Sequence, residues 1–199
     1  MENKINIDHL FNRIKLVVIN PKAAWEEIKS EPRATKDLVL NYMLPLVLIP
    51  TIASFIGYGL IGSNTYFRSS SISWGLNQAI LAFVGAFLGV FISAWCIHKL
   101  APSFGTQTSI DKATKLVVYA YTPTWLAGIF YLVPTLSILG LVAAIYSLYI
   151  LYIGFKPITN VPEEKKTNFF VISLICIIGV SFILSLALGA ILVSIGLAY

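Results

Sequence analysis

The residues that could carry chemistry in this chain are few and lie far apart. The only histidines are His9, in a polar N-terminal segment, and His98, at the end of an apolar run. Intramembrane proteolysis needs a serine–histidine pair or two aspartates at membrane depth, because a nucleophile must have a base within hydrogen-bond reach. No aspartate or glutamate falls inside an apolar run. The sequence therefore predicts a protein that is not an enzyme and that uses no cofactor.

The other residues and motifs that could carry chemistry also give no sign of a reactive site. Cys96 and Cys176 lie in separate apolar runs without the spacing of a metal site, so we interpret them as packing residues. The chain has no glycine-rich phosphate loop. An ion-coupled transporter usually carries an ionisable residue within the membrane, and the apolar runs contain none. This argues against proton coupling through carboxylates, although not against passive permeation.

The elements that hold these residues are membrane helices. Of 199 residues, 57% are hydrophobic and 12% are charged, and the mean hydropathy is +0.82, which is far outside the range of soluble domains. A helix needs about 20 apolar residues to cross a hydrocarbon core about 30 Å thick. We expect an all-α, polytopic membrane bundle of five transmembrane helices over 38–199, after a cytosolic head at 1–37. The expected spans are 38–62, 74–97, 116–132, 136–155 and 169–198.

The head is predicted to form two short helices. Apolar residues from Ile7 to Val18 recur at helical spacing, which indicates an amphipathic helix. Asn20 and Pro21 then read as an N-cap and a first helical residue, and Pro32 ends this second helix. We expect the head to lie along the membrane interface, through Phe11, Ile14, Trp25, Lys29 and Arg33. The alternative is that its apolar faces pack on the protein's own loops.

Charges in the connecting segments predict the orientation. Seven of the fourteen Lys and Arg residues lie in the head, three in 98–115 and three in 156–168, whereas the 63–73 loop has only Arg68. The positive-inside rule therefore places the N-terminus in the cytoplasm and the C-terminus outside. Anionic lipid at the cytosolic face is the expected contact of the net charge of +5. The mixed charges form no basic patch for nucleic acid.

Polar residues within the spans have two readings. The candidates for a cavity or a helix kink are Asn41, Tyr42, Pro45, Pro50, Tyr121, Pro123, Pro134, Tyr146 and Tyr149. The functional reading is a polar cavity that opens to the cytoplasm. The alternative is an aromatic belt at the interface, together with hydrogen bonds between helices that repair the kinks at the prolines.

Small residues mark expected helix contacts. Gly85, Gly89 and Ser93 place a stripe of small side chains on one face of the second span, and Gly128 and Gly154 are further candidates for close packing. Such stripes let helices approach closely. We expect packing within one chain, with homodimerisation as the alternative.

Several of these residues together resemble a known family. The head sequence NPKAAWEEIK at 20–29, the YTP of 121–123 with Gly128 and Pro134, and the YSLY of 146–149 with Gly154 are similar to the Yip domain family. The resemblance implies five spans, a cytosolic N-terminus and a C-terminus on the far side. Eukaryotic members of the family are linked to Rab-type GTPases and vesicle traffic. This chain lacks their long Pro/Gln/Gly-rich tail, and its compact head resembles the prokaryotic branch.

Two hypotheses on function follow. The first is a non-enzymatic protein of the bacterial cytoplasmic membrane that organises lipid or partner proteins through its head and loops. The alternative is a small transporter, channel or lipid scramblase, in which the proline-containing first span and the tyrosine-lined hairpin form a pathway. The expected partners are the lipid bilayer and a protein, which could be a second copy of this chain.

Overall fold

The computed structural model describes residues 7–62 and 71–194, so Arg68 and the last residues of the fifth expected span lie outside the described part. All elements in this part are helical. The α-helices are α1 (Ile7–Ile19), α2 (Pro21–Ser30), α3 (Thr35–Leu38), α4 (Leu44–Ser54), α5 (Ile72–Leu100), α6 (Ile110–Ala120), α7 (Thr122–Ala127), α8 (Leu139–Thr159) and α9 (Glu163–Ser194). Two π-helices, η1 (Val39–Met43) and η2 (Phe55–Ile61), and three 3₁₀-helices, η3 (Ala101–Phe104), η4 (Gly128–Leu132) and η5 (Pro134–Leu136), join them.

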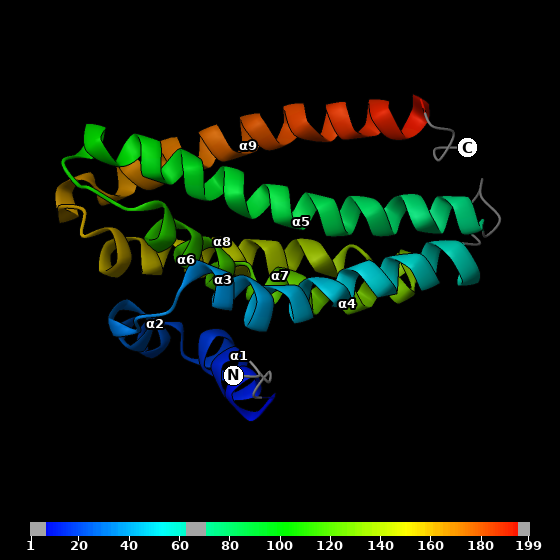
Figure 1. The fold of residues 1–199 in the computed structure, drawn as a ribbon, viewed down its shortest axis with the longest axis horizontal. Coiled ribbons are helices and arrows are strands. Elements are labelled where there is room, and N and C mark those ends of the chain that lie inside the picture. Colours follow the sequence, from blue (N-terminus) through cyan, green and yellow to red (C-terminus); the bar gives the residue numbers. More distant parts are fainter. Residues whose placement is uncertain (1–6, 63–70, 195–199) are drawn as a thin grey trace.

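The long helices lie side by side and the head lies beside one end of them (Figure 1). Helix α2, the start of α6, the end of α8 and the start of α9 gather at this end, which we call the head end. The start of α5 and the end of α9 lie at the other, the far end. The head, 98–115 and 156–168, which carry most of the basic residues, therefore come together.

Four helical stretches in the described residues are long and apolar enough to cross a membrane. They are Thr35–Ile61, Ile72–Phe104, Leu139–Thr159 and Glu163–Ile191, and each contains most of a predicted span. The predicted span at 116–132 is instead divided among α6, α7 and η4. The division follows from Pro123, which lacks a backbone N–H and sits in the first turn of α7, so that a new helix begins after Tyr121.

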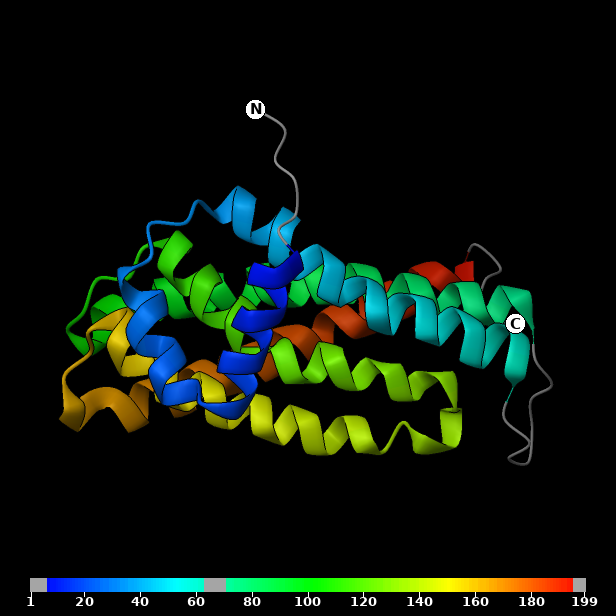
Figure 2. The same cartoon turned by 90° about the horizontal axis from the view of Figure 1, so that it is seen from below.

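This divided segment runs alongside the first long stretch, in the same direction. At the head end, Thr35 Oγ1 donates a hydrogen bond to Asp111 Oδ1 at 2.5 Å. Midway, Gly128 lies against Pro50, and at the far end a Cβ placed on Gly57 would be 3.0 Å from the carbonyl oxygen of Leu132. Figure 2 shows the segment reaching the turn into α8 at that end.

Prolines shape the first stretch without breaking it. Pro45 cannot donate a backbone hydrogen bond, and the π-helix η1 directly precedes α4, where the Leu44 N–H bonds to the carbonyl of Val39 across a wider turn. Pro50 lies inside α4, and the second π-helix, η2, begins five residues later. The predicted kink region is therefore a continuous helix with two wide turns.

Close contact at the far end depends on two glycines that the sequence analysis did not select. A Cβ on Gly75 of α5 would fall 2.7 Å from the backbone nitrogen of Gly59 in η2. No side chain fits at such a separation, so the glycines allow the two backbones to touch.

Helix α9 is the most loosely held of the long helices. It contacts α5, α8 and η3, and apolar side chains such as Ile175 and Phe182 are each 65% exposed. One contact to α5 joins Cys176 Sγ to Cys96 Sγ at 3.0 Å, and both thiols are free. Exposed apolar side chains on a long helix are suited to contact with lipid tails.

Candidate functional site

Trp25 fixes the head to the bundle. Its indole ring fills a space beside Gly154 of α8, and its Nε1 donates a hydrogen bond of 3.0 Å to the carbonyl of Ile150. The ring also meets Tyr119 of α6 edge-on, with centroids 6.4 Å apart. The side chain is only 1% exposed, so the head is docked through a buried aromatic anchor.

Arg13 holds the two head helices together. Its Nη1 donates to Glu27 Oε2 and its Nη2 to Glu31 Oε2, each at 3.1 Å. The Arg13 side chain is 10% exposed, and Glu31 also lies 3.9 Å from Arg33. Partly covered ion pairs are screened less by solvent than exposed ones, so this cluster gives the head a defined geometry.

A chain of polar contacts continues from the head into the bundle. Arg33 Nη1 donates to the Tyr119 hydroxyl at 3.2 Å, and the rings of Tyr119 and Tyr42 meet with centroids 4.7 Å apart. The Tyr42 hydroxyl shares a hydrogen bond of 2.9 Å with Thr122 Oγ1 at the start of α7. The head is thereby connected to the point at which the divided segment changes helix.

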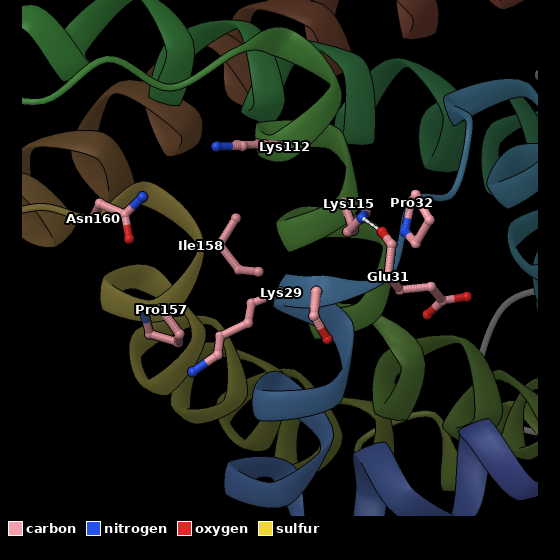
Figure 3. A pocket seen from close by; sticks show the side chains of 9 residues that line it. Lys29, Glu31, Pro32, Lys112, Lys115, Pro157, Ile158 and Asn160 are labelled. Atoms are coloured by element: carbon pink, nitrogen blue, oxygen red, sulfur yellow. Dashed lines mark hydrogen bonds between the residues drawn. The ribbon is translucent and has the colours of Figure 1, made fainter.

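A basic cavity of about 360 Å³ opens between the head and the bundle at this junction (Figure 3). Lys29 of α2 and Lys112 and Lys115 of α6 line it, together with the end of α8 near Ile158. Lys115 Nζ donates to the backbone carbonyl of Glu31 at 2.5 Å. Burial lowers the pKa of Lys115 from its ordinary value of 10.5, and nearby cations add to this although Glu31 opposes it.

The structure separates the residues predicted for the membrane interface. Trp25 is buried in the bundle, and Arg33 is turned toward Glu31 and Tyr119. The interface prediction is wrong for Trp25, because helical periodicity marks an apolar face without saying what covers it, and for Arg33 it stays a prediction. Ile14 packs on the core, whereas Phe11 is 66% exposed and the Lys29 side chain pairs with Glu26.

The tyrosines that were candidates for a shared cavity lie in different environments. Tyr42 is buried, the Tyr146 hydroxyl donates to the carbonyl of Val18 at 2.7 Å, and Tyr149 is 49% exposed and stacks on Tyr146. Asn41 is half-buried in η1. Tyr121 lines a groove, whereas Tyr42, Tyr146 and Tyr149 make local contacts.

Hydrogen bonds repair the break at Pro123. The backbone N–H of Thr124, in the first turn of α7, donates to Ser147 Oγ of α8 at 3.3 Å, and the two side-chain oxygens are 2.8 Å apart. A serine thus supplies the partner that an open helix start lacks. Pro134 begins η5 at the corner between η4 and α8.

The four glycines predicted to pack closely also differ in their surroundings. A Cβ on Gly154 would be 2.8 Å from Leu116 Cδ1, and one on Gly128 would be 2.8 Å from the Pro50 Cα. A Cβ on Gly85 or Gly89 would meet no atom within 4 Å. The prediction that these last two pack closely within the chain is therefore wrong, because the part of α5 that carries them has no near neighbour on that face.

An apolar groove of about 520 Å³ lies between α7, α8 and α9. Its walls are mainly leucine and isoleucine, with a few hydroxyl groups. The hydroxyl-bearing residues are Tyr121, Thr124, Ser147, Ser181 and Ser185.

Three residues of the junction escaped the sequence analysis as site residues. Arg13 stood on the polar face of a helix, and Lys112 and Lys115 were counted only as charges of a loop. The spacing of the two lysines by three could have indicated a shared helix face. Their approach to Lys29 depends on tertiary packing.

No group of three or more His, Cys, Asp or Glu residues that could hold a metal occurs among residues 7–62 and 71–194. The side chains at the junction offer hydrogen-bonding and electrostatic contacts.

Comparisons with known proteins agree with this architecture. The chain is 28% identical over 158 residues to the inner membrane protein YohC of Escherichia coli strain K12, a match that covers 75% of this chain and 80% of the relative. YohC of an Escherichia coli O6:H1 strain matches to the same extent. No solved structure matches. The family model described as the Yip1 domain matches residues 15–197, and this membrane protein therefore belongs to the Yip1 domain family, as its sequence motifs predicted.

Proposed function

We propose that this protein is a non-enzymatic, five-span protein of the bacterial inner membrane that organises lipid and partner proteins at the cytoplasmic face. The observation that carries the proposal is the docked head: Trp25 anchors it to α8 and Arg13 joins its two helices. A head held in this way presents a fixed polar surface at one end of the bundle. Phe11, which is 66% exposed, is available for contact with the headgroup region.

The divided segment is the proposed third span. This proposal is supported because the segment runs beside the first long stretch. The two are in contact from Asp111, which lies against Thr35, to Leu132, which lies against Gly57. Backbone groups at membrane depth need partners, and Ser147 supplies one at the break. Five crossings place the head and the C-terminus on opposite sides.

The proposed orientation puts the head end in the cytoplasm. Twelve of the fourteen Lys and Arg residues belong to described segments at that end, which the positive-inside rule assigns to the cytoplasm. The name of the YohC relatives supports the bacterial inner membrane as the location.

The test releases the head. The double variant Arg13→Ala, Trp25→Ala removes the ion pairs within the head and its anchor to α8, and the control Asn12→Ala, Lys22→Ala changes two exposed head residues. Lipids that co-purify are identified by native mass spectrometry, and neighbouring proteins by cross-linking in cells. We expect the double variant to lose lipids and neighbours that the control retains. If deletion of residues 1–37 changes neither set, the proposal fails.

A second candidate function is that of a small transporter, channel or lipid scramblase. The groove between α8 and α9 favours it, because Ser181 and Ser185 bring hydroxyl groups to an apolar surface beside the membrane. Purified protein in liposomes is tested for solute release and for exchange of a fluorescent lipid between leaflets. Activity that Ser181→Leu blocks supports this function, and liposomes that move neither solutes nor lipids contradict it.

A further inference from the structure

The cavity at the junction is a place where positive charge is concentrated. Lys29 reaches it from the head, and Lys112 and Lys115 from α6, so lysine side chains from two separate elements line one space (Figure 3). Its volume of about 360 Å³ is at the lower end of the range for small-ligand sites, which is about 300–1,000 Å³.

Nearby carboxylates neutralise this charge only in part. The Glu31 side chain is engaged by Arg13 and Arg33, and in Figure 3 it points away from Lys29 and Lys112. Asp111, next to Lys112 in the chain, accepts the hydrogen bond from Thr35. Glu26 pairs with Lys29, so the cavity keeps an excess of positive charge.

The surroundings of Lys115 favour the binding of an anion. Its pKa is lowered because burial disfavours the charged form, and although the charge of Glu31 opposes this, the positive charges of Lys112, Arg33 and Arg13 act in the same direction as burial. An anion bound beside Lys115 would offset both effects. The contact of Lys115 with the Glu31 carbonyl supplies a neutral acceptor and no negative charge.

The place of the cavity in the fold suits a headgroup-sized ligand. Ile158 and Pro157, at the end of the long apolar helix α8, line one wall, and Asn160 caps that helix in the left-handed region with φ 54°. The cavity therefore lies where a membrane-crossing helix ends and polar segments begin. Lysine ammonium groups bind phosphate oxygens through charge-assisted hydrogen bonds.

We propose that Lys29, Lys112 and Lys115 form a binding site for a phosphate group, carried by an anionic phospholipid or by free phosphate. The proposal rests on the proposed function, since it names what the docked head and α6 bind together. It needs the head to be docked, because Lys29 comes from α2 and the other two lysines from α6.

The test measures lipid binding to the full chain. Wild type and the variant Lys112→Gln, Lys115→Gln are placed in nanodiscs of phosphatidylcholine with or without phosphatidylglycerol, and bound lipid is counted by native mass spectrometry. The control Lys22→Gln, Lys36→Gln removes the same charge from exposed positions that do not line the cavity. Loss of charge-assisted hydrogen bonds predicts at least about tenfold weaker retention of phosphatidylglycerol by the cavity variant alone.

A second arm separates the two sources of phosphate. Inorganic phosphate is titrated into the protein in neutral detergent and followed by ³¹P line broadening. Broadening that the cavity variant abolishes assigns the site to free phosphate, whereas retention of phosphatidylglycerol without such broadening assigns it to a lipid headgroup. Lys112→Gln alone, at an exposed position, tests the site if the double variant does not fold.

Two outcomes overturn the inference. One is equal binding of both probes to wild type and the cavity variant, and the other is an equal loss in the control, which would show a diffuse effect of charge. Either result leaves the proposed function standing if release of the head still removes lipids and partners. If release of the head changes neither the bound lipids nor the neighbouring proteins, the proposed function is contradicted, whatever the cavity variant shows.

Discussion

The Trp25 indole donates its hydrogen bond to the Ile150 carbonyl, an oxygen that already belongs to the backbone ladder of α8. The head is thus attached to a helix whose own hydrogen bonds remain in place. Gly154 makes the attachment possible, because it stands one turn further on and leaves room for the ring.

Trp25→Phe should remove this hydrogen bond and keep most of the packing, which lowers the free energy of unfolding by about 1 kcal/mol. Trp25→Ala should lower it by about 3–5 kcal/mol, because it leaves a cavity. Thermal unfolding in detergent measures both changes. Trp95→Phe is the control, since Trp95 is 52% exposed. Equal effects at the two tryptophans would contradict the anchor.

Four glycines provide a second test. Gly154→Ala and Gly128→Ala should destabilise the fold by about 1–3 kcal/mol, because the added methyl meets Leu116 or Pro50 at 2.8 Å. Gly85→Ala and Gly89→Ala should be neutral or stabilising by up to about 1 kcal/mol, since alanine favours a helix and no atom lies within 4 Å. The unfolding temperatures of the four variants test this difference between the two pairs of glycines. A destabilising Gly85→Ala would instead indicate a contact with a second copy.

The proposed five-span topology predicts which corners are outside. In a background of Cys96→Ala and Cys176→Ala, an impermeant maleimide added to intact cells should label Thr135→Cys but not Glu164→Cys. Both should react once the membrane is opened. If the divided segment did not cross, the two positions would show the reverse pattern.

The lowered pKa of Lys115 predicts a pH dependence of stability. The native state loses this proton at a lower pH than the unfolded chain, whose lysine titrates near 10.5. Burial of the charged lysine therefore lowers the free energy of unfolding at low pH. This destabilisation decreases as the pH rises from the lowered pKa of the native state toward 10.5. The unfolding temperature of wild type should rise relative to that of Lys115→Gln between pH 7 and pH 10. The comparison with Lys22→Gln, at an exposed position, is the control, and a difference independent of pH would be evidence against the assignment.

The approach of the two cysteines predicts a cross-link. Mild oxidation with copper phenanthroline should join Cys96 Sγ and Cys176 Sγ, because the atoms are 3.0 Å apart, with loss of two protons and two electrons to the oxidant. The product is a monomer that migrates faster on a non-reducing gel, and Cys176→Ser should abolish it. Formation of a linked dimer instead would contradict the contact of α9 with α5.

Much of the fold could be predicted from the sequence, because apolar run length and helix signals act locally. Asn20 does accept from the Ala23 N–H at 3.3 Å, and Pro21 does begin α2. Pro123 marked the place where the third run changes, but a proline leaves open whether a helix bends or divides. The outcome depends on Ser147 and Tyr42, which come from other helices.

The site was harder to predict, since its parts are distant in sequence. The pattern of α1 and α2 showed an apolar face, and lipid or protein could cover such a face equally well. Equal spacing likewise could not distinguish Gly89, which has open space, from Gly154, which holds a tryptophan. The three lysines of the cavity share no motif, so only the docking of the head brings them together.

The separation of 125 positions along the chain between Trp25 and Ile150 also sets an order of events during synthesis. The head leaves the ribosome first, yet the carbonyl that receives its indole and the glycine that admits its ring are made only with α8. Until then the head lacks its attachment to α8, and its apolar face is free to meet membrane or chaperone. Completion of α8 is thus the moment at which the nascent chain can dock its head fully against the bundle.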